Sequence, residues 1–375
     1  MSTPLPLQGI KVLDFSTLLP GPVCSLLLAK SGAEVIKIER PVGGDEMRSY
    51  HPKSHEDSGN FIILNRGKKS LALDLKNPES LTLIYDLVKT CDIVLEQFRP
   101  GVMDRLQLGF NTLKEINPRL IYCSITGYGQ TGPLAAVAAH DLNYMAQAGL
   151  LSLVGTGENN NIPSLPPALI ADIAGGAYPA FMNILLALRQ RDLTNDAIHI
   201  DVAMSENLFA FQYWGIVNRD LLGKSPGYSD DLVTGGSARY HIYETQDHRF
   251  IAAAPLEDKF WGLFCELIQL PEQYRLPGAS NNEVTHAIAN IFKSHTSDFW
   301  QQLFEGKDVC CNLVLGLDEA MADPHFKQRH IFDQFISDGE DLLTALPLPL
   351  AKNLSDPTSK MPYPHLGEHN DEFIK

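Results

Sequence analysis

The chain lacks the excess of positive charge that is typical of proteins that bind nucleic acids or anionic membranes. Its 375 residues contain 30 Lys and Arg against 45 Asp and Glu, which gives a formal net charge of -15. Recognition of a phosphate backbone or of an anionic lipid surface needs clustered basic side chains. We therefore expect neither a nucleic-acid partner nor a membrane partner.

Cysteine pairs with metal-ligand spacing are also missing. The six cysteines show no CxxC pattern, and the adjacent Cys310 and Cys311 cannot readily chelate one ion together. Cys24 and Cys123 lie within apolar stretches typical of a core. The sequence predicts reduced cysteines, with neither a disulfide framework nor a metal site.

Signals for secretion and membrane insertion are not evident. The first residues, MSTPLPLQGIK, do not combine a basic start with an apolar stretch, and we see no apolar run of transmembrane length. We expect a cytoplasmic protein.

Short β-rich runs alternate with helical patterns through the first half of the chain. This alternation predicts an α/β domain with a mainly parallel sheet, whose function lies in loops at the carboxyl ends of the strands. The expected strands are residues 11–16, 34–39, 70–75, 92–97 and 120–126, and the expected helices lie near 22–31, 78–90 and 102–115.

The pattern changes beyond about Gly235. A hairpin from RYHIYET and RFIAAAP, followed by helices, predicts a smaller α+β domain. The Pro-rich C-terminal tail is expected to return to the first domain. We place the large domain at residues 1–224 and 330–375 and the small domain at residues 225–329.

The segment GYGQTG (127–132) matches the dinucleotide-binding pattern of glycines, but its context does not. Pro133 follows directly, and no acidic ribose-binding residue follows in a later strand. The turn after the first strand, TLLPG, holds a single glycine. We expect a loop whose backbone can approach a ligand closely, not a nicotinamide cofactor site.

Basic residues gather in the first third of this acidic chain. Such a cluster suits a polyanionic small molecule such as a nucleotide or coenzyme A, although solvated surface charge explains any one of them equally well. The cluster comprises Lys37, Arg40, Arg48, Arg66, Lys68, Lys69, Arg99 and Arg105.

Two side chains are candidates for proton transfer. His140 precedes DLNY, and Asp172 lies among apolar residues and glycines in LIADIAGG. Each alone is compatible with a helix cap. A carboxylate in an apolar setting is costly without a purpose, however, and a His–Asp pair suits reaction at a carbon acid.

Taken together, blocks along nearly the whole chain resemble the family III CoA transferases, and within them the α-methylacyl-CoA racemase branch. The blocks are LQGIKVLDFST, GAEVIKIERP, LNRGKKSLALDLK, DIVLEQFRPGVMDRLQLGF, LIYCSITGYGQTGP, AAHDLNY, ADIAGG, ARYHIYET, ADPHFKQRHIF and HLGEHNDEF. The resemblance implies a Rossmann-like large domain, a small domain and an interlocked homodimer.

The resemblance also assigns roles in binding coenzyme A. Arg40 would contact the adenine region, whereas Arg99 and Arg105 would face the phosphates. Phe98 and Tyr144 are further candidates for binding the coenzyme, and Tyr144 and Met145 for binding the acyl group. Coenzyme A would arrive as part of the thioester substrate, so no separate cofactor is expected.

The catalytic positions favour the racemase branch. Asp172 matches the aspartate shared by active members, and His140 matches a histidine that the transferases generally lack. Glu257 matches the glutamate that holds this histidine in the racemases. The chain departs from the branch at Ala168, where racemases carry an asparagine bonded to the aspartate.

These matches imply inversion of the α-carbon of a 2-methylacyl-CoA by His140 and Asp172. We expect backbone N–H groups just after Asp172 to stabilise the enolate. Two alternatives stay open. In a CoA transferase Asp172 would be the covalent nucleophile, and an acyl-CoA-binding protein without catalysis would use the pocket alone.

Overall fold

The computed structural model describes residues 4–156, 162–275, 278–337, 342–358 and 360–374. The chain divides into two compact units. Unit 1 comprises Met1–Ala148, Pro166–Phe211 and Pro324–Lys375, and unit 2 comprises Gly149–Leu165 and Gln212–Asp323.

These bounds differ from the expected domains at each junction. Residues 149–165 and 212–224 fall in the second unit, and residues 324–329 fall in the first. Local contacts explain part of the difference. Trp214 donates its indole N–H to Asp231 at 3.1 Å, and Gly155 lies against the ring of Tyr228. Both contacts join the reassigned residues to the second unit.

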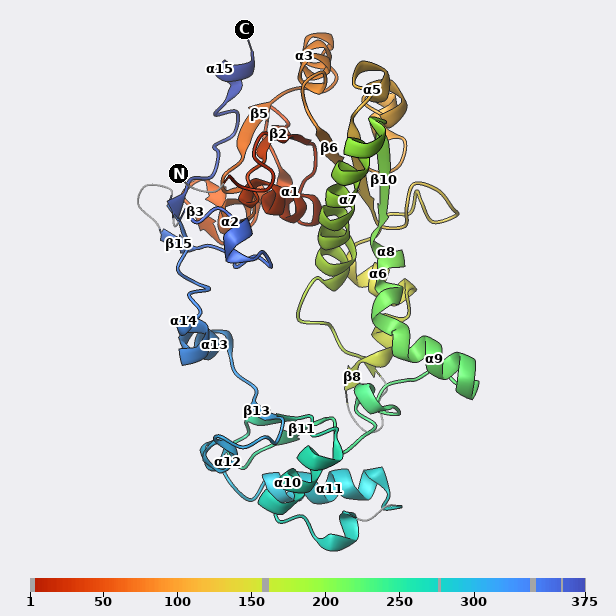
Figure 1. The fold of residues 1–375 in the computed structure, drawn as a ribbon, viewed down its shortest axis with the longest axis vertical. Helices are drawn as coiled ribbons and strands as arrows, with labels where there is room; N and C mark the ends of the chain where they lie inside the picture. Colours follow the sequence, from red (N-terminus) through yellow and green to blue (C-terminus); the bar gives the residue numbers. More distant parts are fainter. Residues whose placement is uncertain (1–3, 157–161, 276–277, 338–341, 359, 375) are drawn as a thin grey trace. The chain divides into compact units, whose positions relative to one another are not determined.

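Unit 1 is built on a six-stranded parallel sheet (Figure 1). In spatial order its strands are β5 (Lys69–Ala72), β2 (Glu34–Glu39), β1 (Lys11–Asp14), β6 (Ile93–Glu96), β7 (Ile121–Thr126) and β10 (Ile198–Ala203). Numbered along the chain, this order is 3-2-1-4-5-6, the doubly wound arrangement. The predicted α/β class and parallel sheet are confirmed.

Helices cover both faces of this sheet, as a sheet buried on both sides requires. α1 and α7 pack on one face, whereas α3 and α5 pack with Leu13, Ile36 and Val94 on the other. The helices of unit 1 are α1 (Pro20–Lys30), α2 (Gly59–Asn65), α3 (Pro78–Val88), α4 (Val102–Arg105), α5 (Phe110–Ile116), α6 (Asp141–Gln147), the π-helix η3 (Ala171–Ala177), α7 (Tyr178–Thr194) and α8 (Met204–Asn207).

Local chemistry fixes several of these helices. Pro78 occupies the first turn of α3, where its missing N–H costs nothing, and Asn77 caps the helix by accepting the N–H of Glu79 at 2.9 Å. The helix expected near 102–115 is two helices, because Gln107 has φ +60° and interrupts the helical turn between α4 and α5.

The C-terminal tail returns to unit 1, as predicted. The guanidinium groups of Arg48 and Arg66 donate to the carbonyls of Pro364 and Leu346 at 3.0 and 2.7 Å. The small elements of unit 1 are η1 (Glu46–Ser49), β3 (Lys53–Ser54), β4 (Asp57–Ser58), α14 (Pro324–Gln328), β14 (Phe335–Ser337), β15 (Leu342–Thr344), η7 (Lys352–Leu354), β16 (Lys360–Met361) and α15 (Asn370–Phe373).

Unit 2 has its own aromatic core. The ring of Tyr243 stacks on Phe292 at 5.3 Å, and Phe264, Trp300 and Phe304 pack around them. The hairpin β11–β12 is antiparallel, as predicted. The elements are η2 (Leu150–Leu153), β8 (Gly155–Thr156), β9 (Ile162–Pro163), α9 (Tyr213–Leu222), η5 (Leu232–Thr234), β11 (His241–Glu244), β12 (Phe250–Ala253), α10 (Asp258–Leu267), η6 (Glu272–Tyr274), α11 (Asn281–Phe292), α12 (Ser297–Phe304), β13 (Cys311–Leu313) and α13 (Leu317–Ala322), and η4 (Leu208–Gln212) ends at the boundary between the units.

One helix corrects the view that no apolar run is long enough to span a membrane. The continuous helix Ala171–Thr194 meets the test of length and composition, with a mean hydropathy of 1.3. Its π-helical first part packs on α1 and α8, and α7 packs on strands β7 and β10. The apolar residues on this side belong to the core of unit 1.

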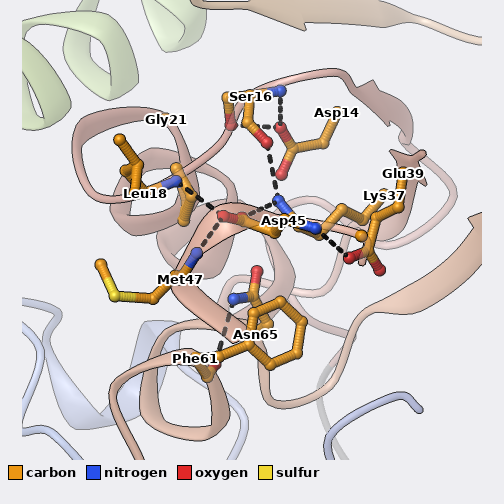
Figure 2. A network of polar contacts seen from close by, with 12 residues as sticks. Asp14, Ser16, Leu18, Gly21, Lys37, Glu39, Asp45, Met47, Phe61 and Asn65 are labelled. Atoms are coloured by element: carbon orange, nitrogen blue, oxygen red, sulfur yellow. Dashed lines mark hydrogen bonds and ion pairs between the residues drawn. The ribbon is translucent and has the colours of Figure 1, made fainter. Parts of the chain in front are cut away.

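A buried network of charges holds the loop that follows β1 (Figure 2). Lys37 on β2 donates to the carbonyl of Ser16 at 2.7 Å and pairs with Asp45 at 2.8 Å, with both charged side chains 0% exposed. Asp45 in turn accepts the N–H of Leu18 at 3.0 Å. This bond holds Leu18 at φ +62°, a conformation that a leucine seldom adopts.

Removal of Asp45 tests the weight of this network. Asp45→Ala leaves the Lys37 ammonium buried without the carboxylate that pairs with it, and we expect the free energy of unfolding to fall by about 3–5 kcal/mol. Urea denaturation measures the change. Lys89→Ala, which removes an exposed pair with Asp86, is the control and should cost about 0–1 kcal/mol. Equal losses of unfolding free energy in the two variants would contradict the stabilising role that we assign to the buried Lys37–Asp45 pair.

Candidate active site

A pocket of about 320 Å³ opens at the carboxyl edge of the sheet in unit 1. Its walls come from the loops after β1, β6 and β7, so it lies where the strand order reverses between β1 and β6. Ligands of doubly wound folds bind at this position. The lining comprises Thr17, Leu18, Pro20, residues 97–100, residues 125–128, Ala135, residues 137–140, Tyr144, Asp172 and Met204.

Five of the predicted site residues meet in this pocket. They are Phe98, Arg99, His140, Tyr144 and Asp172. The chain brings them together from three places: the loop after β6, the start of α6 and the first turn of η3. The prediction of a histidine and a carboxyl group at one site is thus consistent with the geometry.

His140 immediately precedes α6, and its side chain is exposed. Its backbone N–H donates to the Asn143 side chain at 3.0 Å, and its carbonyl accepts the N–H of Asn143 at 2.8 Å. The described part of the chain shows no hydrogen bond to the imidazole itself. The ring is therefore free to serve a ligand in the pocket.

Asp172 lies in the π-helical turn η3, a rare geometry often found at functional sites. Gly175 explains how this turn comes so close to the end of β10, because a Cβ there would lie 2.6 Å from the carbonyl oxygen of Met204. The apolar and glycine-rich character of ADIAGG thus serves close packing beside the pocket.

Burial raises the pKa of Asp172 to about 7, and the neighbouring negative charge of Asp141 adds to the effect. Within the described residues no donor bonds to the Asp172 carboxyl group. The position of the asparagine found in racemases is occupied by the exposed Ala168, which offers no side-chain donor. Asp172 is therefore poised to gain or lose a proton near neutral pH.

Tyr144 forms part of the wall of the same pocket. Its hydroxyl donates to the Ala139 carbonyl at 2.7 Å, and burial followed by the charge of Asp172 raises its pKa to about 12. Gly127 makes room for the ring, because a Cβ would lie 2.2 Å from a ring carbon. The first glycine of GYGQTG therefore makes room for a tyrosine while it lines the pocket. The close approach of this loop to a ligand stays a prediction.

The loop after β6 is fixed by a hydrogen bond to Glu96, a residue that the sequence analysis did not predict. Its carboxylate accepts the N–H of Phe98 at 2.8 Å, and burial raises its pKa to about 7. The next residue, Gln97, accepts the N–H of Gly21 at 2.9 Å and ties this loop to α1. Phe98 and Arg99 thus lie on a loop fixed at two points.

Two predicted arginines lie outside the lining of this pocket. Arg40 is exposed, donates to the carbonyl of Gly44 at 3.1 Å and lies 3.5 Å from Glu46. Arg105 ends α4 and is also exposed. Their contacts with coenzyme A stay predictions.

Glu257 belongs to unit 2, whereas His140 belongs to unit 1. Glu257 is exposed and precedes α10, where its backbone carbonyl accepts the N–H groups of Phe260 and Trp261. Its predicted bond to His140 stays a prediction.

Several pocket residues were not predicted, although the strand order could have indicated some. Thr17 and Leu18 follow β1, and Gln97 follows β6, at the reversal of strand order.

The backbone N–H groups near Asp172, which we expected to stabilise an enolate, already have acceptors within the protein. The N–H of Asp172 donates to Asp141, and that of Ile173 donates to Leu169.

Comparison with known proteins assigns the family. The model of CoA-transferase family III matches residues 7–370. The chain belongs to this family.

Curated relatives include both racemases and transferases. The chain is 36% identical to alpha-methylacyl-CoA racemase of Mus musculus, over 98% of this chain and 92% of the mouse protein. It is 30% identical to human succinyl-CoA:glutarate CoA-transferase, over 99% of this chain and 85% of that protein. Both relatives are enzymes whose names specify CoA thioester chemistry.

A solved structure supports the fold. The crystal structure of a CAIB/BAIF family protein from Brucella suis superposes with a TM-score of 0.83 at 29% identity, covering 99% of this chain and 98% of that one.

The raised pKa of Asp172 predicts a dependence of stability on pH. Because the pKa in the fold is about 7 and the usual value is 3.8, the protonated form is favoured in the fold. The contribution of protonated Asp172 to the free energy of unfolding is fully present below about pH 3.8 and is lost as the pH rises through about 7. Asp172→Asn does not ionise, so we expect it to exceed the wild type in unfolding free energy by roughly 2 kcal/mol at pH 8. Urea denaturation should find no such gain at pH 4, and a gain of equal size at both values would contradict the assignment.

Proposed function

We propose that the protein is a 2-methylacyl-CoA racemase that inverts the α-carbon by a two-base transfer of one proton. The observation that carries the proposal is the meeting of His140 and Asp172 in one pocket, with an Asp172 pKa of about 7. General acid–base catalysis is most effective when the pKa lies near the working pH.

In one direction the neutral imidazole of His140 removes the α-proton and the C–H electron pair enters the enolate. The protonated Asp172 then donates its proton to the opposite face of the carbon. In the other direction the Asp172 carboxylate removes the proton and the His140 imidazolium returns one. The enzyme ends each turnover with its proton on the other group.

The enolate oxygen needs hydrogen-bond donors in a site that excludes water. The first N–H groups of a helix have no partner within it. In the described structure the N–H groups of Asp141 and Leu142, at the start of α6, meet no acceptor, and they follow His140 directly. They replace the donors near Asp172 that we first expected.

Coenzyme A is proposed to bind at Phe98 and Arg99, with Arg99 and Arg105 facing its phosphates and Arg40 contacting its adenine region. The pocket supplies the first pair, and the other two are exposed cations of the same unit. Coenzyme A is the only group required, because a thioester α-proton is acidic enough without a further cofactor. Glu257 is proposed to hold the His140 imidazole, and the cytoplasm is the proposed location.

The alternative is a CoA transferase with Asp172 as nucleophile, which the identity to succinyl-CoA:glutarate CoA-transferase supports. The site favours the racemase because the transferase mechanism gives His140 no part, although His140 lines the same pocket as Asp172. A binding protein without catalysis would leave both proton-transfer groups without a use.

Exchange of the α-proton tests this proposal. In D₂O the wild type should incorporate deuterium at the α-carbon of 2-methylacyl-CoA, as followed by mass spectrometry. His140→Ala and Asp172→Asn should each lower the exchange rate by about 10²–10⁴-fold. Asn77→Ala, a cap of the remote helix α3, is the folded control and should exchange like the wild type. CoA transfer that survives His140→Ala, without exchange in the wild type, would overturn the racemase assignment.

We also propose a homodimer. Large apolar side chains stand exposed on α7, among them Met182 at 59% and Leu186 at 67%, and on α9, among them Leu221 at 79%. Exposed apolar groups of this kind mark interaction surfaces. Interlocking of the two chains is part of the proposal by family resemblance.

Sedimentation velocity tests the dimer. The expected mass is twice the 41.5 kDa of one chain, because a second copy would cover the apolar side chains of α7. Leu186→Glu should shift the equilibrium towards monomer by placing a charge at the contact, whereas Lys89→Ala should not. A monomeric wild type at micromolar concentration would contradict the proposal.

A further inference from the structure

One carboxyl group that the proposed reaction does not use is linked to both catalytic residues, to His140 along the chain and to Asp172 by a hydrogen bond. Asp141 follows His140 directly and begins α6, and the residue is only 5% exposed. Its Oδ1 accepts the N–H of Asp172 at 2.9 Å, and the backbone of Ala171 donates to the same carboxylate. One side chain thus joins the first turn of η3 to the first turn of α6.

This contact replaces a local cap. The N–H groups of a first helical turn need acceptors outside the helix. The residue before η3 is Ile170, which has helical φ and ψ and no side chain able to accept them. Asp141, 31 residues earlier in the chain, supplies the acceptor instead. The position of η3, and of Asp172 within it, is therefore tied to the residue beside His140.

We propose that Asp141 is the positioning residue of the two-base reaction and fixes the Asp172 carboxyl group opposite the His140 imidazole. The inference rests on the proposed racemase activity. The side chain of Asp141 does not touch the substrate in this account; it acts through Asp172, whereas only the backbone N–H of Asp141 faces the enolate.

The charge of Asp141 also acts on the Asp172 carboxyl group. A like charge nearby raises the pKa of a carboxyl group, and Asp141 is the charge that acts on Asp172 in addition to burial. Other titratable side chains that share the pocket are Arg99, Tyr128, His140 and Tyr144. The packed elements α1 and α8 contribute Pro20 and Met204 to the lining, neither of which titrates.

Two substitutions separate positioning from charge. Asp141→Asn keeps an amide oxygen able to accept the N–H of Asp172 but removes the negative charge. Asp141→Ala removes both. Asn77→Ala, the cap of the remote helix α3, is the control for a loss of capping that leaves the pocket alone.

The pH profile of α-proton exchange from D₂O is the first readout. The active enzyme holds one proton on the His140–Asp172 pair, so the rate follows a bell whose limbs belong to the pair. A lower pKa of Asp172 lowers the sum of the pKa values of the two limbs by the same amount and moves the bell to lower pH. We expect Asp141→Asn to move the bell to lower pH, with the shifts of its two limbs adding up to roughly one pH unit, and to keep the maximal rate within a few-fold. Asp141→Ala should lower the maximal rate by about 10²-fold through misplacement, and Asn77→Ala should change neither.

Titration of Asp172 by ¹³C NMR of aspartate-labelled protein is the second readout and needs no turnover. Asp172→Asn identifies its signal, and Asp141→Asn should move its midpoint to lower pH. Exchange by the wild type together with an unmoved titration or profile in Asp141→Asn, or an undiminished maximal rate in Asp141→Ala, overturns the inference alone. If the wild type exchanges no α-proton, the proposed function fails and the role of Asp141 in that reaction fails with it.

Discussion

The proposed chemistry of this protein depends on a carboxyl group that is half-buried beside another carboxylate and is bonded to no donor in the described structure. Burial and the charge of Asp141 hold the pKa of Asp172 at about 7. Close packing and hydrogen bonds around η3 offset the free-energy cost of burying the Asp172 carboxyl group. Gly175 leaves room for the carbonyl of Met204, and Asp141 accepts the N–H groups of the first turn. A proton donor and acceptor for neutral pH is the result.

The parallel sheet positions the loops that form the pocket around Asp172. Parallel strands in the order 3-2-1-4-5-6 bring the loops after β1 and β6 to one edge. The Lys37–Asp45 pair fixes the first loop, since Asp45 holds Leu18, and Glu96 fixes the second, since it holds Phe98. Buried charges of unit 1 thus act on the pocket through backbone hydrogen bonds.

Much of this could be predicted from the sequence, for physical reasons. Apolar strands alternating with helices specify the parallel sheet, and an aspartate among apolar residues and glycines is too costly to be accidental. The contact of Asp141 with the amide of Asp172 could not be predicted, because it joins residues 31 apart through tertiary structure. The break between α4 and α5 was missed because a single left-handed residue, Gln107, causes it. The domain bounds were placed from changes in pattern, whereas the actual junctions depend on side-chain contacts such as that of Trp214 with Asp231.

The central claim is tested most directly by a crystal structure with a thioether analogue of 2-methylacyl-CoA. This analogue lacks the thioester carbonyl, so it can neither acylate Asp172 nor be cleaved. The account predicts that the carbon equivalent to the α-carbon lies about 3–3.5 Å from both the His140 imidazole and the Asp172 carboxyl group, on opposite faces. A complex in which Asp172 instead faces the carbon that replaces the thioester carbonyl, with His140 out of reach of the α-carbon, would contradict it.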